Sequence, residues 1–216
     1  MTKDEYKQQF SEDDSVGWQA IDEAVERLYP NQEPKHFAPK LYYPLGGEEP
    51  LDGLSVYESS NQTDHFHIVS YGFSQLYYNE ESAGEEYSKW GFELTFRLKK
   101  NAGDNQNPDW ALDLIQNLAK YVFSSKRYFD EYHFFPANGP IRLDYDTDIT
   151  ALAFITDPEL GKIQTPNGEV VFLQIVGLTT AEYDFLKSNP EENKTEQLIA
   201  ELRRTNPLLI TDLARK

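Results

Sequence analysis

The chain has 216 residues, of which 39% are hydrophobic and 14% aromatic, and this content is too high for a disordered protein. It contains no cysteine, which excludes disulfides, thiolate nucleophiles, iron–sulfur clusters and cysteine-based zinc sites. Its formal net charge of −17 repels nucleic acid and anionic membranes and favours a basic protein partner.

The first 14 residues are polar and acidic, and we expect them to form a flexible end. They lack the apolar core of a signal peptide, and no apolar run in the chain approaches the roughly 18 residues that a membrane span needs. We therefore expect a cytoplasmic protein with one domain over residues 15–216.

Apolar residues at helical spacing predict a first helix after Ser15, a plausible N-cap, and Pro30 ends it. The Gly- and Pro-rich stretch 45–53 predicts a loop. Two short strands are expected after it, at Leu54–Tyr57 and His65–Tyr71.

The segment Trp90–Leu98 is the clearest strand, because its large apolar residues alternate with small or polar ones. The apolar face must be buried. The opposite face carries Glu93 and Arg97, which we expect to be solvent-exposed or paired across strands.

A second helix is predicted after an Asn107 cap, with Pro108 at its first position and a buried apolar stripe that ends at Val122. Tyr121 lies off this stripe, so its hydroxyl could reach a rim or groove, or its ring could pack at the edge of the sheet. Residues 126–140 are predicted to be irregular.

The C-terminal part predicts strands at 151–155 and 169–176, and the second is apolar on both faces, as in a central strand. A capping box at 179–182 opens a short helix, another helix covers 195–204, and 208–213 is expected to be a last strand. Helices and strands do not alternate regularly, so we predict an α+β fold whose mixed or mostly antiparallel sheet packs against several helices.

Motifs for chemistry are scarce. His65 and His67 share one strand face, and His36 or His133 could complete a zinc site, but no other ligand pattern supports one. Residues 144–148 imitate the start of a calcium loop that then lacks its Gly and Glu. Phosphate-binding and nucleophile-elbow motifs are absent, and the paired carboxylates lie in loops. We predict no metal, no cofactor and no catalysis, with an enzyme or metal-binding protein that uses His65 and His67 as the least favoured alternative.

Several longer segments resemble the Suppressor of fused family, in order along the chain. They are Ala20-Ile21-Asp22 through Arg27-Leu28-Tyr29-Pro30, Leu45-Gly46-Gly47 with Pro50-Leu51-Asp52-Gly53, the run 65–77, Gly91-Phe92-Glu93-Leu94-Thr95-Phe96-Arg97-Leu98, Leu118-Ala119-Lys120-Tyr121-Val122-Phe123, Gln164-Thr165-Pro166 with Phe172-Leu173-Gln174-Ile175-Val176-Gly177, and the tail Leu209-Ile210-Thr211-Asp212. The resemblance covers about residues 16–213.

This resemblance implies a protein-binding function. Animal members are two-domain cytoplasmic regulators of Hedgehog signalling that grip an extended peptide of a transcription factor between their domains, and this chain resembles only the N-terminal domain. Stand-alone bacterial members occur among immunity proteins that neutralise toxin domains. The resemblance therefore implies either an immunity protein that occludes a basic toxin domain, our leading hypothesis, or a peptide-binding regulator. An unpaired strand edge beside Tyr121 would favour the second.

The resemblance also suggests partner-binding residues. Tyr121 matches a family tyrosine that contacts the bound peptide. A family aspartate precedes a histidine, and here the region 129–133 is one residue shorter, which puts Tyr132 at the aspartate position and leaves Asp130 or Glu131 to take over its role. The sequence does not indicate the oligomeric state.

Overall fold

The computed structural model describes residues 1–101, 107–143, 145–190 and 193–216. Its strands form one eight-stranded sheet with the order β1-β2-β3-β4-β8-β6-β5, and β7 pairs with the start of β8. All the pairs are antiparallel except β4 with β8. The strands are β1 Lys35–Phe37, β2 Gly53–Ser59, β3 His65–Tyr71, β4 Tyr87–Lys99, β5 Phe134–Pro136, β6 Ile149–Thr156, β7 Lys162–Thr165 and β8 Gly168–Thr179.

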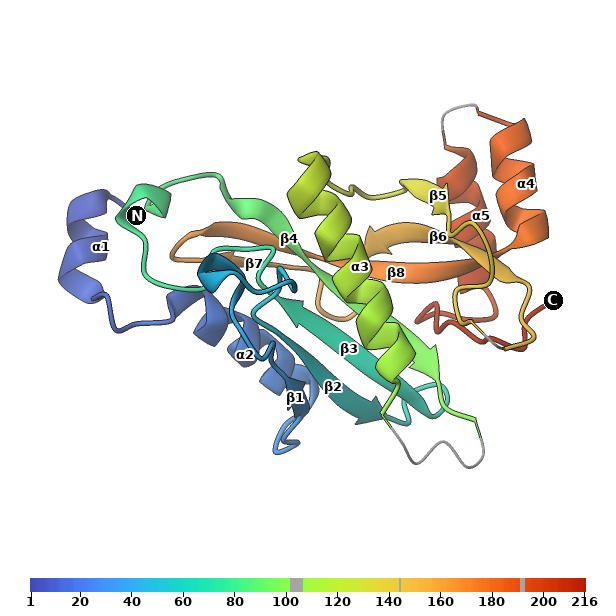
Figure 1. Cartoon of the computed structure of the whole chain (residues 1–216), viewed down its shortest axis with the longest axis horizontal. Helices are drawn as coiled ribbons and strands as arrows, with labels where there is room; N and C mark the ends of the chain where they lie inside the picture. Colours follow the sequence, from blue (N-terminus) through green and yellow to red (C-terminus); the bar gives the residue numbers. More distant parts are fainter. Residues whose placement is uncertain (102–106, 144, 191–192) are drawn as a thin grey trace.

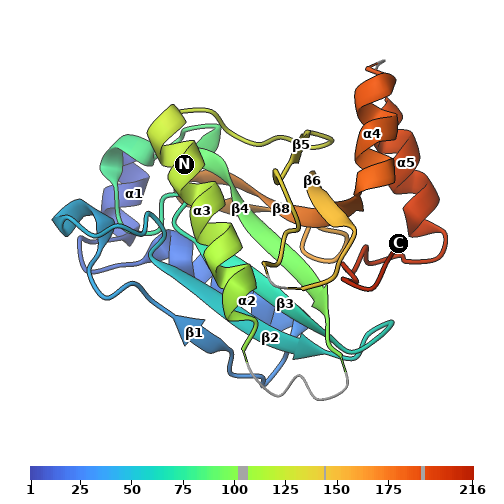
Figure 2. The same cartoon turned by 45° about the vertical axis from the view of Figure 1, so that its right-hand side comes forward.

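Helices cover both faces of this sheet (Figure 1). Helix α3 crosses one face, whereas α2 packs on the other face and the pair α4 and α5 lies at the β6 end (Figure 2). The α-helices are α1 Lys3–Gln9, α2 Val16–Leu28, α3 Asp109–Ser125, α4 Thr180–Ser188 and α5 Lys194–Arg203, and two short 3-10 helices are η1 Tyr43–Leu45 and η2 Glu80–Ser82. The α+β prediction is confirmed.

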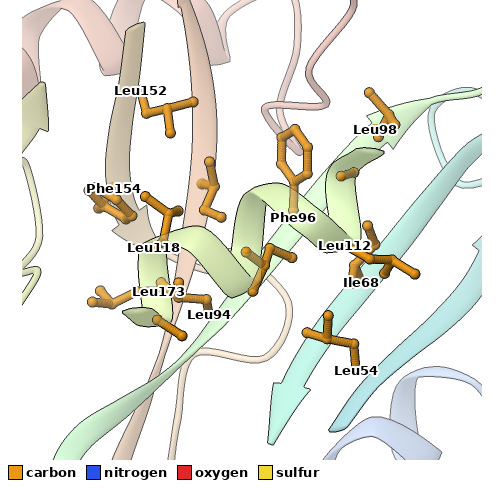
Figure 3. Close-up of a cluster of buried hydrophobic side chains, with 14 of the residues drawn as sticks. Leu54, Ile68, Leu94, Phe96, Leu98, Leu112, Leu118, Leu152, Phe154 and Leu173 are labelled. Atoms are coloured by element: carbon orange, nitrogen blue, oxygen red, sulfur yellow. The ribbon is translucent and has the colours of Figure 1, made fainter. Parts of the chain in front are cut away.

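The largest core lies between α3 and the sheet (Figure 3). Leu94, Phe96 and Leu98 of β4 point into it, as their alternation predicts, and Leu112 and Leu118 of α3 pack over them. Each fully buried side chain of this size contributes about 1.5–3 kcal/mol relative to exposure. The central position of β8, between β4 and β6, also agrees with its two apolar faces.

The polar face of β4 was predicted only in part. Glu93 and Arg97 have no exposed surface, so solvent exposure was wrong for both. The second option, contact across strands, is confirmed: Ser70 of β3 donates to Glu93, and Arg97 Nη1 lies 3.4 Å from His65 Nε2 of β3. A second layer formed by α2 and the segment after β6 covers this face.

Three local predictions differ from the structure. Residues 208–213 form no strand, because Thr211 makes only an isolated bridge with Leu98. Helix α3 takes Pro108 rather than Asn107 as its N-cap residue. The N-terminal segment, expected as a flexible end, carries α1, whose own capping box at Thr2 and buried Tyr6 went unrecognised.

Candidate functional site

Tyr121 stands on the solvent side of α3 and is 44% exposed. Its ring stacks on Phe129 with centroids 5.9 Å apart and an interplanar angle of 20°. Phe129 in turn stacks on Phe154 of β6 at 4.3 Å and on Phe135 of β5 at 5.5 Å. An aromatic column therefore connects an exposed tyrosine to the core beside the edge strand β5, so the ring packs at the sheet edge while much of its surface stays accessible.

The chain reaches β5 through a tight bend after α3. Lys126 ends the helix in the left-handed conformation, and Tyr132 has a φ of 65°. Tyr132 N–H donates to the carbonyl of Phe154, and Phe154 N–H donates to the carbonyl of His133. Two residues thus oppose one, as in a β-bulge, which turns the side chains that follow.

This bulge separates Tyr132 from its sequence neighbours. Its side chain packs with Phe134 and Tyr183 on the α4–α5 face of the sheet, whereas Phe129 and Phe135 pack on the α3 face. The structure therefore brings Tyr121 and the loop 128–131 together but places Tyr132 on the other side.

The strand β5 forms one end of the sheet. Among the described strands it pairs only with β6. Ala137 N–H donates to the carbonyl of Thr150 in β6, and Phe154 N–H of β6 donates to the carbonyl of His133. In an antiparallel ladder every second residue bonds to the neighbouring strand, so the backbone N–H and C=O of Phe134 point away from β6. Pro136 limits this free edge to a short segment, since proline offers no N–H.

A groove with a volume of about 990 Å³ opens next to the aromatic column. Its walls come from the start of β4, the start of β8 and the loop 128–131, so that Phe129, Asp130 and Glu131 line it and Tyr121 and Tyr132 do not. Glu131 Oε1 accepts a hydrogen bond of 3.1 Å from Thr156 N–H, which ties the loop to the end of β6.

The same groove contains cations. Lys89 donates to the carbonyl of Gly72, and burial lowers its pKa, although the nearby Glu93 and Asp52 oppose that shift. Lys126 lies over the ring of Trp90, with Nζ 5.9 Å from the centroid. The groove therefore offers both signs of charge, with the two carboxylates of the loop 130–131 at the side nearest β6.

His65 and His67, the candidates for a metal or catalytic site, lie in the core and line none of the described cavities. His67 Nε2 is 3.1 Å from Asp157 Oδ2 and its Nδ1 is 2.8 Å from the Tyr29 hydroxyl. His65 Nδ1 is 2.8 Å from the carbonyl of Thr63. Both rings are occupied by hydrogen bonds of ordinary structural kind.

Arg97 is the centre of a buried polar layer, which it forms with His65, His67, Asp157, Glu159 and Gln174. Its guanidinium contacts Asp157 at 2.9 Å and Glu159 at 2.9 Å, and Nε donates to Gln174. Burial and the Arg97 charge lower the pKa of His67 to about 4, so the imidazole is neutral at pH 7. Burial alone would raise the pKa of Asp157, but His67 and Arg97 lower it well below its usual range.

The remaining histidines do not join these two. His36 contacts Ser55, and His133 Nδ1 accepts a hydrogen bond from Asp130 N–H. Within the described ranges, no group of three or more His, Asp or Glu side chains is arranged to hold a metal ion. The suggested calcium loop includes residue 144, which lies outside the described residues.

Comparison with known proteins identifies the family. The family model of the Suppressor of fused protein matches residues 47–216. The chain belongs to the Suppressor of fused family. It is 38% identical to the Suppressor of fused homologues of Homo sapiens and Mus musculus over 214 residues, which cover 92% of this chain and 43% of each relative. The chain thus spans less than half the length of these relatives.

Solved structures agree with this membership. A chain in the Sufu-Fu complex has a TM-score of 0.83 and 30% identity, with 94% of this chain and 91% of that chain covered. Drosophila Suppressor of Fused has the same TM-score at 29% identity, with 95% of this chain and 52% of that chain covered. A Suppressor of fused homologue from Neisseria gonorrhoeae shares the fold at 15% identity and a TM-score of 0.63, covering 93% of this chain and 95% of that chain.

Sequence reasoning missed two parts of the site in this Suppressor of fused domain. Residues 126–140 were predicted to be irregular, but they contain the edge strand β5. Its signal, two phenylalanines before Pro136, is too short for a period to be recognised. The groove was also missed, because its walls come from segments far apart in the sequence. None of the described helices is long and apolar enough to cross a bilayer.

Proposed function

We propose that this chain is a non-catalytic protein-binding domain that captures an extended segment of a partner along the edge of β5. The observation that carries the proposal is the free edge of β5 beside the exposed Tyr121 and its stack on Phe129. An added strand would gain backbone hydrogen bonds from Phe134, and its side chains would find an aromatic anchor.

The charges next to this edge indicate the kind of segment. Asp130 and Glu131 lie where the loop meets β5, and the chain as a whole has a net charge of −17. Asp130 and Glu131 favour a partner segment with basic residues at the end that lies next to the loop 128–131. The negative electrostatic field of the whole chain increases the association rate of such a partner. Tyr132 is proposed to contribute from the opposite face, beside Phe134 and Tyr183.

The comparisons support a binding function without naming the partner. One relative was solved as the Sufu-Fu complex, so a member of this fold binds a protein. The curated relatives are more than twice as long as the segment they share with this chain. We propose that this domain holds its segment along the edge of β5, in the cytoplasm.

The test is capture of a partner from the native host by the tagged chain and by two variants. Tyr121→Ala should lose the partner because the exposed end of the aromatic column is removed. Phe185→Ala, which truncates an aromatic residue of similar exposure on α4, should retain it. Equal recovery by both variants would exclude the edge beside Tyr121 as the binding surface.

A second candidate function is that of an immunity protein that occludes a basic toxin domain. The net charge of −17 favours it, since an acidic surface attracts a cationic domain. Co-expression with the product of the neighbouring gene tests it. Survival of cells that express a toxic neighbour together with this chain would support immunity, and continued toxicity would count against it.

A further inference from the structure

A second cavity, of about 730 Å³, lies away from the β5 edge, at the β1 end of the sheet. Its walls are the segment 37–41, the segment 46–49 and one face of α3. Phe37, Leu54 and Leu112 give it apolar walls. None of the residues proposed above for partner binding lines this cavity.

Gln116, a residue that lines this cavity, carries a buried acceptor without a donor. Gln116 of α3 lines it and is only 8% exposed, and its Oε1 accepts no hydrogen bond from any described residue. A buried polar atom without a partner destabilises the folded state, and folded proteins rarely keep one. The terminal torsion of Gln116 is broad, so the amide can turn over and present its oxygen to a donor in the cavity.

The charges around the cavity are also unbalanced. Glu48, Glu49, Asp109 and Asp113 line it, and none of them forms an ion pair with another described residue. The cations that line it are Lys40 and Lys120, so four carboxylates stand against two amines. A ligand that carries positive charge and hydrogen-bond donors would satisfy both Gln116 and this excess of negative charge.

We propose that this cavity binds an arginine side chain of a partner polypeptide. A guanidinium is planar and carries five N–H donors, so it can serve Gln116 and a carboxylate at once while its face packs on the apolar walls. A lysine ammonium is a compact, strongly hydrated charge and suits such walls less well. The inference goes beyond the β5 edge and holds or fails independently of it.

The rim of the cavity indicates the neighbours of that arginine. Leu41, which lines the cavity, is 48% exposed, and Tyr42, Tyr43 and Leu45 continue this exposed apolar surface. Scattered apolar side chains on a surface need no explanation, but four in one short segment beside a binding cavity favour apolar contacts. The expected ligand is therefore a short segment in which arginine lies between apolar residues.

The experiment is a titration of the full-length, ¹⁵N-labelled chain with acetyl-Leu-Arg-Leu-amide, followed by NMR. A matched peptide carries citrulline, which keeps the shape of arginine and removes its charge. The arginine peptide should give saturable shifts of the Gln116 side-chain amide and of the Gly46 and Gly47 backbone amides. The citrulline peptide should bind about ten-fold more weakly, because its hydrogen bonds are no longer charge-assisted.

Two variants test the role of individual groups. Gln116→Met keeps the length of the side chain but removes the acceptor, so binding should weaken about ten-fold while the thermal midpoint stays unchanged or rises. A residue with a merely structural polar role would instead lower the midpoint. Asp113→Asn should weaken binding about three-fold, as expected for an exposed charge.

The control is Asp184→Asn, which makes the same charge change on α4 at the opposite end of the sheet (Figure 1). It should leave binding unchanged, as should Tyr121→Ala. Equal binding of both peptides, shifts that map to β5 instead, or normal binding by Gln116→Met would overturn the proposal. If Gln116→Met fails to fold, Asp113→Asn and the shift map still decide between these outcomes.

Discussion

Replacing Asp157 with asparagine tests whether the buried polar layer acts as one unit. The Asp157 carboxylate contacts Arg97 through both oxygens, at 2.9 and 3.2 Å, and also accepts from Thr95 and from the backbone N–H groups of Glu159 and Leu160. Asparagine keeps the shape but removes the charge, and its amide group would face donors. Arg97, fully buried, would keep only Glu159 as an anionic partner.

Removing one partner of a buried ion pair costs about 3–5 kcal/mol, because the other charge stays in a medium that solvates it poorly. We expect Asp157→Asn to lower the free energy of unfolding by this amount at pH 7. Equilibrium urea denaturation, followed by tryptophan fluorescence, measures it. Asp184 is exposed, so Asp184→Asn should change the free energy of unfolding by about 0.5 kcal/mol or less. A loss below about 1 kcal/mol for Asp157→Asn would show that Glu159 alone satisfies Arg97.

Three further outcomes are expected from the structure. Unfolded His67 gains a proton near its ordinary pKa of about 6.5, whereas folded His67 gains one only near pH 4, so the free energy of unfolding should fall as pH drops from about 6.5 to 4. His67→Gln should make this dependence on pH, measured by urea denaturation at each pH, less steep. Gly17→Ala should lower the thermal midpoint by several degrees, since its new Cβ would lie 2.1 Å from the carbonyl oxygen of Gln75. Phe129→Ala should cost about 3–5 kcal/mol in urea denaturation, whereas Tyr121→Ala should cost about 1 kcal/mol or less, because only Phe129 is buried.

The sequence predicted those elements whose pattern reports directly on burial. The alternation in β4 predicted its buried face, and the two apolar faces of β8 predicted a central strand. The stripe of α3 placed Tyr121 outside its buried positions but left open whether the ring packs at the sheet edge. The capping box at Thr179 also predicted the start of α4. In each case, neighbouring residues carry the whole signal.

Other features depend on contacts that no local pattern records. Glu93 looked like a residue on a solvated strand face, but it is buried where Ser70, Gly72 and Ser74 donate hydrogen bonds to its carboxylate. The alternating sequence pattern of a strand is the same whether its polar face contacts water or a second layer of protein. The side chain of Tyr132 lies on the face of the sheet opposite to Phe129 because a β-bulge adds one residue to the strand. The composition of the segment does not indicate this extra residue.

The parallel pairing of β4 with β8 has a kinetic consequence. Strand β4 joins β8, which follows about 80 residues later, and this pairing closes the middle of the sheet. During synthesis, the long inner strand β4 therefore has an unsatisfied side until most of the chain has left the ribosome. A nascent chain halted before residue 168 should aggregate readily, mature slowly and bind chaperones, even though the finished domain buries most of that strand.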